Sequence, residues 1–405
     1  MKKPELLAPV GDMTRLNYAV AYGADAVYMA YRNFGMRASA GNFDLEEMKE
    51  AIDFCHRSGV KVYVTVNTYP TVEETEQLPA FFSELCELAP DAMIIADIGV
   101  MTLAKRYAPN IPIHISTQAN ITNPVTAKAY ADLGATRLVL ARECSLEDIR
   151  RIKAAVGEQV EIECFVHGAM CMSVSGRCHL SAFLTGRDAN RGACAQPCRW
   201  EYTIMEKTRE GQYFPVCQDQ KGTYIFNSKD MCMIEHISDL IEAGVDSFKI
   251  EGRMKTFYYV AATVKAYRQA IDEVCATGKL TDPTHYLAQA GKASHRDFST
   301  GFYYAPMDEN GFNTKDGGYI RPYDVVATVV ENGDGKVLVQ QKNRFFAGDE
   351  LEVLSPDRED FTFVVESLIT EEGESVTSAP HSQQLLWIPC TQRLHPLAIL
   401  RKKND

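Results

Sequence analysis

The sequence predicts an α/β protein built on a (β/α)8 TIM-like barrel and followed by a small C-terminal β-barrel domain. The first 255 residues repeat one unit, in which an amphipathic helix ends at a glycine and a short apolar strand follows. Eight such strands occur, mostly at the spacing that a (β/α)8 barrel needs. After about residue 300 the pattern changes to short runs of alternating polar and apolar residues, which are typical of an all-β domain.

The repeated unit is clearest at three helices, Thr14–Tyr22, Val125–Leu133 and Ser238–Ala243, each followed by a glycine that suits the left-handed residue closing a helix. The runs that follow are continuously apolar, as in parallel strands buried on both faces. An open doubly wound sheet is the alternative, but no Gly-x-Gly-x-x-Gly follows the first strand. The expected strands are Leu6–Pro9, Ala26–Met29, Val62–Asn67, Ala92–Ala96, Ile113–Thr117, Arg137–Ala141, Ile162–Val166 and Ser247–Ile250.

We expect the barrel domain to span residues 1–290, with a cysteine-rich insertion at 167–235. The linker and the all-β domain are expected to span 291–405. The insertion separates strands seven and eight, and extra length after a barrel strand lies on the C-terminal face, where barrel active sites are built. The stretch Tyr258–Ala290 reads as helical and is expected to join the two parts. Val325–Val330 and Lys336–Gln341, around a Gly-Asp-Gly turn, read as a β-hairpin.

Polar residues at the strand ends should gather at this C-terminal mouth of the barrel. Lys249, Glu251 and Arg253 alternate along the last strand, so all three should point to one side. Charges on the inward face of a barrel are costly unless a polar site receives them. The expected mouth residues are Asn67, Asp97, Gln118, Asn120, Arg142, Glu143, His167, Lys249, Glu251 and Arg253. We expect His167, Lys249 and Glu251 to be catalytic, although an ion-pair network around the barrel end would use the same charges.

Composition excludes several classes of protein. The chain has 405 residues, is 46% hydrophobic and carries a formal charge of −12, which argues against a globally basic nucleic-acid coat protein but not against a local basic groove. No apolar run approaches the roughly 18 residues that cross a bilayer. The N-terminus runs into an apolar strand without the pattern of a secretory signal. We therefore expect a cytoplasmic protein with no membrane partner.

Seven of the twelve cysteines fall between residues 164 and 232. Reduced cytosolic cysteines seldom form structural disulfides, so a dense group needs another explanation. Cys171, Cys178, Cys194 and Cys198 are separated by six, fifteen and three residues. Four thiolates from two loops can hold an iron–sulfur cluster or structural zinc. Zinc sites usually have two tight Cys-x₂₋₄-Cys pairs, and only the second pair is tight here, which weakens the case for zinc. Reduced cysteines that pack a long insertion are a further alternative.

Arginines are interleaved with these cysteines, at positions 177, 187, 191 and 199. A four-thiolate cluster is anionic, so guanidinium groups would offset its charge and could also bind a carboxylate or phosphate. Solvated salt bridges are the alternative. The substrate-binding residues that we expect are Arg177, Arg187, Asn190, Arg253 and Gln118.

No metalloprotease helix, nucleophile elbow or P-loop occurs in the sequence. Cys171 and His167 could be drawn as a nucleophile and base, but a spacing of four residues fixes no geometry. Three functions therefore stay open: a redox enzyme with a cluster, a peptidase, and a binding module stabilised by zinc.

At these residues the chain resembles the collagenase-like proteins of peptidase family U-32. The resemblance rests on Phe165-Val-His-Gly-Ala-Met-Cys171, Ser175-Gly-Arg-Cys178 and Ser181, and on Arg187–Arg199. Phe226–Cys232, Phe248–Arg253, Glu5–Gly11 and Gly23–Tyr28 also match, so most of the chain is covered. Within the family it is most similar to the bacterial tRNA hydroxylation proteins, which make 5-hydroxyuridine at the wobble position.

The resemblance implies a [4Fe-4S] cluster, prephenate as the source of the oxygen atom, and oxygen-independent action on the tRNA anticodon loop. Carried over, Cys171, Cys178 and Cys194 are ligands and Cys198 is the fourth, with Cys232 or Cys217 as alternates. A small acidic co-substrate and an electron donor or second protein are the further partners. A splayed wobble base could stack on an aromatic side chain such as Tyr28, Tyr31 or Phe34, and the tail Arg401-Lys402-Lys403 could contact phosphates.

Overall fold

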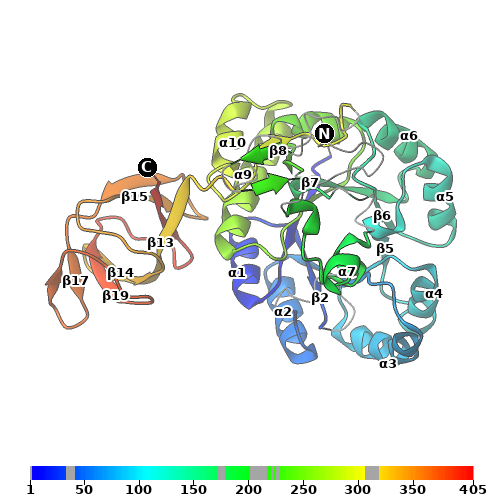
Figure 1. The fold of residues 1–405 in the computed structure, drawn as a ribbon, viewed down its shortest axis with the longest axis horizontal. Helices are drawn as coiled ribbons and strands as arrows, with labels where there is room; N and C mark the ends of the chain where they lie inside the picture. The colour runs from blue at the N-terminus through cyan, green and yellow to red at the C-terminus, as the bar shows by residue number, and fades with distance from the viewer. Residues whose placement is uncertain are drawn as a thin grey trace, which may run out of the picture.

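The computed structural model describes residues 2–32, 42–171, 173, 178–200, 217–219, 222–224, 228–305 and 319–404, with the main chain alone at 191, 199, 217–219 and 222–224. Within these ranges the chain forms two units. Figure 1 shows a ring of strands surrounded by helices, with a smaller β domain beside it.

The first unit is a closed barrel of eight parallel strands. It closes because β11 pairs with both β1 and β7. Its strands are β1 (Glu5–Pro9), β2 (Ala26–Ala30), β3 (Lys61–Val66), β4 (Ala92–Ile95), β5 (Ile113–Ile115), β6 (Arg137–Val139), β7 (Glu161–Ala169) and β11 (Ser247–Ile250). The predicted barrel is confirmed, and each strand end lies within three residues of its predicted position.

Helices cover the outside of the barrel and connect its strands. They are α1 (Met13–Ala21), α2 (Leu45–Arg57), α3 (Val72–Leu88), α4 (Ile98–Tyr107), α5 (Pro124–Asp132), α6 (Leu146–Val156), α8 (Ile237–Glu242) and α9 (Phe257–Thr277), with the short turn η1 (Thr117–Ala119) after β5. Several begin at strong caps; Ser145 and Asp148, for example, bond reciprocally at the start of α6. None of the helices in the described ranges combines the length and apolarity of a membrane span.

One helical expectation needs correction. The stretch Tyr258–Ala290 forms two helices, α9 and α10 (Pro283–Ala290). Rather than only joining the two parts, α9 packs against β1 and α1 and is the eighth helix of the barrel. Its nearly all-apolar first half explains this position, because a helix that is apolar on most sides has to be buried.

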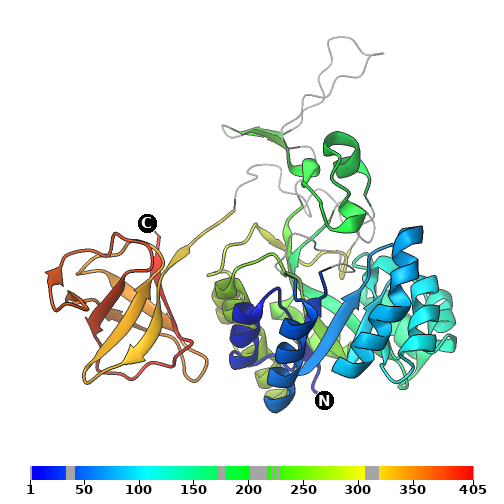
Figure 2. The same ribbon diagram turned by 90° about the horizontal axis from the view of Figure 1, so that it is seen from below.

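The insertion between β7 and β11 stands over the barrel end opposite the N-terminus, as the green segment of Figure 2 shows. Its described elements are α7 (Leu180–Thr185), η3 (Ala189–Arg191), η4 (Pro197–Arg199), β8 (Cys217–Asp219), β9 (Gly222–Tyr224), β10 (Asp230–Cys232) and η5 (Ile234–His236). The end of β7 pairs with β10, which in turn pairs with β12 (Phe298–Ser299). The barrel sheet is thereby extended past its rim at one place, next to the cysteine segment.

The second unit is an antiparallel sheet with its own apolar core. Its strands are β13 (Tyr323–Asn332), β14 (Lys336–Gln341), β15 (Glu350–Leu354), β16 (Phe361–Val364), β17 (Leu368–Thr370), β18 (Ser375–Val376), β19 (Leu385–Pro389) and β20 (Ile399–Lys403). The predicted hairpin is β13–β14. The all-β domain is confirmed, and it has the form of a half-barrel because β16 and β18 are the two edges of its sheet. The exact domain boundaries stay a prediction.

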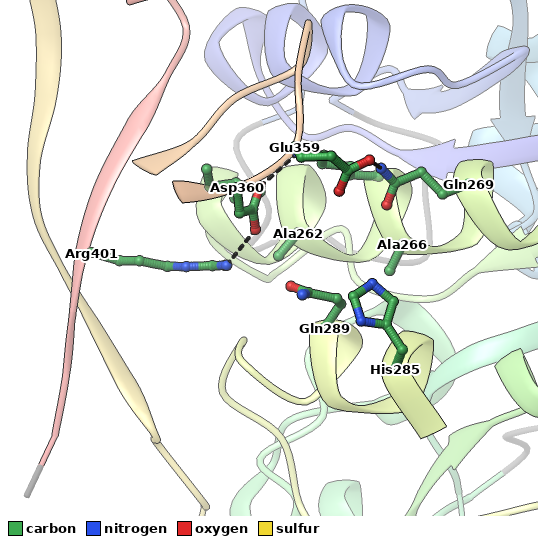
Figure 3. Close-up of a pocket in the computed structure, with 10 residues that line it drawn as sticks. Ala262, Ala266, Gln269, His285, Gln289, Glu359, Asp360 and Arg401 are labelled. Carbon is green, nitrogen blue, oxygen red and sulfur yellow. Dashed lines mark hydrogen bonds and ion pairs between the residues drawn. The ribbon is translucent and has the colours of Figure 1, made fainter. Parts of the chain in front are cut away.

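The two units meet along α9 and α10. Arg401 of β20 is fully buried and bonds to Asp360 (2.8 Å) and to Glu352, and Lys265 of α9 donates to Asp360 (2.6 Å). Figure 3 shows Arg401 directed at Asp360, with Gln289 and His285 on the other side of a small gap. This gap encloses only about 10 Å³, which is about the space of one water molecule. The seam is closely packed, so the β domain has a defined position against the barrel.

Candidate functional site

The C-terminal mouth of the barrel is hollow. A cavity of about 530 Å³, here called the mouth cavity, lies between the strand ends and the described part of the insertion. The polar strand-end residues that line it are Asn67, Gln118, Arg142, Glu143, Lys249, Glu251 and Arg253. The predicted position of Lys249, Glu251 and Arg253 at the mouth is confirmed, since all three line this cavity. Only Lys249 lies within β11, however, and Glu251 and Arg253 follow the end of that strand. Asp97 and Asn120 do not line it; Asp97 caps α4, and Asn120 closes η1.

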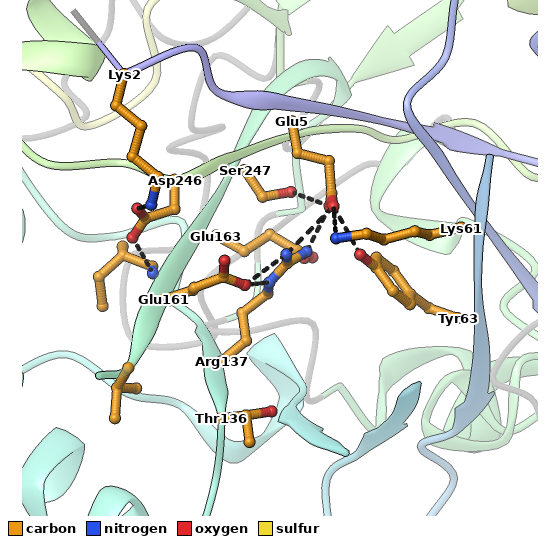
Figure 4. Close-up of polar contacts among 12 residues, drawn as sticks. Lys2, Glu5, Lys61, Tyr63, Thr136, Arg137, Glu161, Glu163, Asp246 and Ser247 are labelled. Carbon is orange, nitrogen blue, oxygen red and sulfur yellow. Dashed lines mark hydrogen bonds and ion pairs between the residues drawn. The ribbon is translucent and has the colours of Figure 1, made fainter. Parts of the chain in front are cut away.

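Beneath the mouth cavity, the barrel interior holds a line of charged side chains, of which Arg137 and Glu163 are fully buried and Glu161 is partly exposed. Figure 4 shows Arg137 among Glu5, Glu161 and Glu163. Arg137 is 2% exposed and donates to Glu5 (2.5 Å), Glu161 (2.6 Å) and Glu163 (3.2 Å). Opposite charges this close offset the cost of burying each other. Glu163 then accepts a hydrogen bond from Lys249 Nζ (2.6 Å), so the line runs from the barrel floor to the cavity.

Lys249 is the cation at the base of the mouth cavity. It is 5% exposed, and its Nζ lies 4.4 Å from the centre of the Tyr28 ring, whose hydroxyl donates to the carbonyl oxygen of Ile250. Burial lowers the pKa of Lys249, while the attraction of Glu163 opposes that shift. The residue can therefore bind an anion in the cavity or exchange a proton more readily than an exposed lysine.

The polar residues next to Lys249 make hydrogen bonds to residues that do not line the mouth cavity. Arg253 is almost fully buried and donates to the side-chain oxygen of Asn42. The carbonyl oxygen of Gln118 accepts a bond from the hydroxyl of Tyr69 (2.6 Å), and that of Glu251 accepts one from Tyr259 (2.8 Å). These bonds fix the main chain at the strand ends, which is how a binding site keeps its side chains in place.

All four predicted cysteine ligands line the mouth cavity. Three of their sulfurs accept a backbone N–H from the residue two positions later: Cys171 from Ser173 (3.4 Å), Cys178 from Leu180 (3.4 Å) and Cys194 from Gln196 (3.3 Å). Hydrogen bonds of this kind stabilise negative charge on sulfur and tune a bound metal centre. The insertion thus presents three cysteines to one cavity with the same local hydrogen bond to each sulfur.

The other cysteines have different surroundings. Cys232 is buried with its sulfur 3.8 Å from the Tyr267 hydroxyl, and burial raises its pKa to about 12. Burial also raises the pKa of Cys55 and of Cys144 to about 12. Such thiols stay protonated and make poor ligands. The structure does not place the alternate Cys232 in either cavity described here, and the side chain of the alternate Cys217 lies outside the described atoms.

The arrangement of the thiols bears on which group they can hold. In the described part of the chain, no three Cys, His, Asp or Glu side chains come close enough to hold a single metal ion. An iron–sulfur cluster is larger than one ion and takes one thiolate at each iron of a four-iron cluster. The four cysteines that line the mouth cavity supply the number and type of ligands that such a cluster takes.

Two of the predicted substrate-binding residues have other surroundings. The amide of Asn190 accepts from the N–H of Cys178 (3.1 Å) and donates to the carbonyl oxygen of Cys178 (3.1 Å). Asn190 therefore positions a cysteine rather than lining the mouth cavity. Arg187 donates to the carbonyl oxygen of Ala193 (3.1 Å) and lines a second cavity, and Arg177 lies outside the described residues.

His167 is not brought to the mouth. Its ring is 2% exposed and packs against Tyr259, Tyr267 and Phe298 on the outer side of β7. Burial lowers its pKa to about 3, so it is neutral at physiological pH. The expectation that a histidine at the end of strand seven faces the cavity is thus wrong, because β7 runs on to Ala169 and pairs there with β10. Its catalytic role stays a prediction.

Sequence reasoning missed the side chains of Glu163 and Phe165, the contacts of Arg142 and the second cavity. Glu163 and Phe165 alternate with apolar residues along β7 and face inward, a signal that could have been read from the strand. Arg142 was expected only as a mouth residue; its guanidinium lies 3.9 Å from the centre of the Phe165 ring and donates to the carbonyl oxygen of Ala169 (2.7 Å). The second cavity had no signal, since the two domains that enclose it are far apart in sequence.

Comparison with known proteins identifies the family. The model of peptidase family U32 matches residues 11–313, and that of the peptidase family U32 C-terminal domain matches residues 321–401. The chain belongs to peptidase family U32. Two U32 relatives match almost the full length: tRNA hydroxylation protein P1 of Bacillus subtilis (strain 168) is 36% identical over 99% of this chain and 95% of its own length, and tRNA hydroxylation protein P of Escherichia coli (strain K12) is 36% identical over 100% and 97%.

A third relative is named for a different RNA. The 23S rRNA 5-hydroxycytidine C2501 synthase of Escherichia coli (strain K12) is 37% identical over 76% of this chain and 44% of its own length. The predicted resemblance to U32 is confirmed.

Proposed function

We propose that this chain is an RNA-modifying enzyme that hydroxylates the wobble uridine of tRNA at C5. The full-length relatives are named for tRNA hydroxylation, and a further U32 relative is named for hydroxylation of a cytidine in rRNA. The observation that carries the proposal is local to the site. Four cysteines and the charged ends of the barrel strands line one cavity of about 530 Å³, which is large enough for a nucleobase and a small acid.

The cofactor in this proposal is a [4Fe-4S] cluster bound by Cys171, Cys178, Cys194 and Cys198. Such a cluster would supply one-electron redox chemistry, which an oxygen-independent hydroxylation requires from some group. The contribution of the chain is to present the sulfurs, to donate N–H groups to three of them, and to fix the loop of Cys178 through Asn190. An electron donor remains a further partner in the proposal.

The acidic co-substrate in the proposal is prephenate, as the source of the hydroxyl group. Carboxylates pair best with cations held in a fixed geometry away from water. Lys249 and Arg253 are both nearly buried and both line the mouth cavity. We assign the co-substrate to these two cations, and the uracil ring to the space beside Tyr28 and Phe165. The proposal gives His167 no catalytic role, because its ring lies away from the mouth cavity.

A wobble base can enter this cavity because it lies in a single-stranded loop, where unstacking costs little. Glu251 lies at the edge shared by the mouth cavity and the second cavity. A carboxylate there can accept a proton or a hydrogen bond from a bound base. Glu251 therefore stays our candidate for acid–base chemistry, next to Lys249.

A peptidase, the activity in the family name, has less support at this site. A cysteine nucleophile needs a base within hydrogen-bond reach. Among the described residues that line the two cavities there is no histidine, and His167 faces the other side of β7. If purified protein cleaves a peptide and Cys171→Ala abolishes that cleavage, the peptidase function stands and our proposal does not.

The function is tested in a strain from which the gene is deleted. We expect 5-hydroxyuridine to disappear from tRNA, to return with the unaltered chain, and to stay absent with Lys249→Met. Nucleoside mass spectrometry measures all three. Unchanged tRNA modification in the deletion strain would reject the proposal.

The cofactor is tested separately on protein purified without oxygen. Iron and acid-labile sulfide should be present in equal amounts, and each of Cys171→Ser, Cys178→Ser, Cys194→Ser and Cys198→Ser should lower both. Cys275→Ser, a partly buried cysteine outside both cavities, is the matched control and should retain both. If the protein instead contains stoichiometric zinc and no sulfide, the four cysteines bind structural zinc and the cluster proposal is rejected.

A further inference from the structure

A second cavity, here called the side cavity, lies between the barrel rim and the β domain. It encloses about 760 Å³ and shares Arg142, Cys171, Cys194, Cys198 and Glu251 with the mouth cavity. Its other wall comes from the start of α9 and from the β domain, including Tyr319, Arg321, Tyr323 and Lys342. The two cavities therefore adjoin at three of the four cysteines Cys171, Cys178, Cys194 and Cys198, here called the cysteine rim, and the β domain forms part of the continuous surface.

The side cavity is locally cationic although the chain is acidic. Its lining contains five cationic residues, Arg142, Arg187, Lys255, Arg321 and Lys342, against the two carboxylates of Glu251 and Asp324. The whole chain has a formal charge of −12. Positive charge gathered in one cleft of an acidic protein raises the local concentration of anions and points to an anionic ligand.

These cations are not neutralised by carboxylates in the described part of the chain; Arg142 and Arg187 donate to main-chain carbonyl oxygens instead. Within the described ranges, Lys255, Arg321 and Lys342 make no ion pair with a carboxylate: Lys255 lies 4.6 Å from the Tyr319 ring centre, and Lys342 donates to the side chain of Gln340. Arg321 and Lys342 are exposed. Lysines and arginines without carboxylate partners in a cleft are those available for phosphates.

Aromatic side chains accompany the cations. Tyr319 keeps 41% of its surface exposed, and Tyr323 and Tyr259 also line the side cavity. Positive charge together with aromatic rings along a groove is typical of surfaces that bind single-stranded nucleic acid, because phosphates meet the cations and the sugars and bases pack on the rings.

We propose that the side cavity binds the single-stranded RNA next to the nucleotide that enters the mouth cavity, and that the β domain is an RNA-binding part of the enzyme through Arg321 and Lys342. This inference rests on the proposed function. A base that leaves its stack for the mouth cavity carries its backbone to the cavity entrance, so the flanking phosphates must lie against the adjoining surface. The side cavity is the described cationic surface that shares that entrance.

The test measures RNA binding by the full chain with fluorescence anisotropy. The probes are a labelled RNA hairpin with a uridine in its loop and a fully paired RNA duplex of equal length. The variant Arg321→Glu/Lys342→Glu should raise the Kd for the hairpin at least about tenfold. The dependence of log K on log salt should become shallower by about 1.4, since each lost phosphate contact of a single strand contributes about 0.7.

The matched control is Lys336→Glu/Lys128→Glu, which changes the net charge equally at residues outside both cavities. It should keep the hairpin affinity within about twofold of the parent. Circular dichroism shows that both double variants are folded. If both double variants weaken binding equally, if neither weakens it, or if the duplex competes as well as the hairpin, the inference is overturned. If the Arg321/Lys342 variant binds the hairpin as tightly as the parent, RNA is not the ligand of this surface, and an acidic protein partner becomes the alternative.

Failure of this inference can be told from failure of the proposed function. If the parent chain restores 5-hydroxyuridine but the Arg321/Lys342 variant binds the hairpin like the parent, the inference alone is lost. If the hairpin binds through these two cations but the deletion strain keeps its tRNA modification, the RNA surface stands and the proposed reaction is lost.

Discussion

At the cysteine rim, single hydrogen bonds from the main chain hold the sulfur atoms in position. Backbone N–H groups donate to the sulfurs of Cys171, Cys178 and Cys194. The buried Cys55, Cys144 and Cys232 instead have their pKa raised by loss of water. The rim differs from the core cysteines in its surroundings, not in residue type. If the proposed cluster is bound, the groups that hold the cysteine loops in place should slow its loss.

Asn190→Ala should accelerate loss of the bound cluster while leaving all four cysteines in place. The change removes both bonds to the main chain of Cys178, each worth about 1 kcal/mol, so the decay rate should rise roughly tenfold or more. Visible absorbance is followed under an iron chelator without oxygen. Asn332→Ala is the control, because Asn332 makes the same two-way bridge, to Leu394 in the β domain, far along the chain from the cysteines. Equal decay in parent and Asn190→Ala would contradict the role of Asn190.

His167 contributes to stability through its buried neutral ring. Its pKa in the folded chain is about 3, against an ordinary value of 6.5, so as pH falls the unfolded chain takes up the proton first. This part of the stability is complete above pH 6.5 and is lost as pH falls toward 3. From pH 7 to pH 5 the loss is about 2 kcal/mol.

His167→Gln should remove most of that pH dependence. Urea unfolding at pH 7, 6 and 5 measures it, and the free energy of unfolding of the variant should fall less steeply than that of the parent. The exposed His381→Gln serves as control and should keep the parent slope. Parallel slopes for parent and His167→Gln would show that His167 does not titrate between the two states in this range.

At the scale of elements, the end of β7 shapes the site. The register between β7 and β11 shifts at Lys249 and Ile250, where β7 continues outward to pair with β10. Gly168 lies at this point with a φ of +112°, and a Cβ there would stand 2.7 Å from the carbonyl oxygen of Glu251. Close approach of two strands at a glycine therefore sets the position of a cavity residue.

Gly168→Ala should destabilise the chain by about 3 kcal/mol and displace Glu251. Both the left-handed φ and the contact contribute. Gly186→Ala is the matched control: its φ is +70°, but nothing lies within 4 Å of the added Cβ, so we expect only about 1 kcal/mol from the backbone. Chemical unfolding measures both, and restoration of 5-hydroxyuridine in the deletion strain should fall for Gly168→Ala alone. Equal destabilisation by the two variants would refute the close-contact argument.

At the scale of the molecule, docking of the β domain creates the side cavity. Lys265 on α9 donates to the carbonyl oxygens of Ser355 (2.7 Å) and Arg358 (2.8 Å) and to Asp360 (2.6 Å). Tyr22 of the barrel adds bonds to Leu354 and Leu397. A seam with several buried polar bonds holds one relative orientation, because each bond is lost if the domains turn.

Lys265→Met should weaken this docking by about 3 kcal/mol, since Asp360 loses its second cation in a nearly buried site. We expect faster proteolysis between residues 290 and 330 and weaker binding of the RNA hairpin. Lys128→Met, which removes an exposed pair with Asp132, should change unfolding by less than about 0.5 kcal/mol. An unchanged proteolysis pattern in Lys265→Met would show that the seam is held by its apolar contacts instead.

The elements of the fold could be predicted from local patterns, because helix stops and apolar runs depend on neighbouring residues. The outcome for the site was mixed. Lys249, Glu251 and Arg253 line the mouth cavity as predicted, although only Lys249 lies within β11. His167 was not, because its direction depends on β10, which returns from more than sixty residues later to pair with β7. The cluster ligands and the co-substrate stay predictions.

The sequence by itself determined the barrel, the all-β domain and the four cysteines of the mouth, since their residue types and periods are local properties of the chain. Only the tertiary structure decided that His167 faces away from the cavity, that Asn190 braces Cys178, and that the β domain closes a cationic side cavity. The physical reason is that these contacts join residues distant along the chain, and their formation depends on packing of whole elements rather than on the preferences of any one segment.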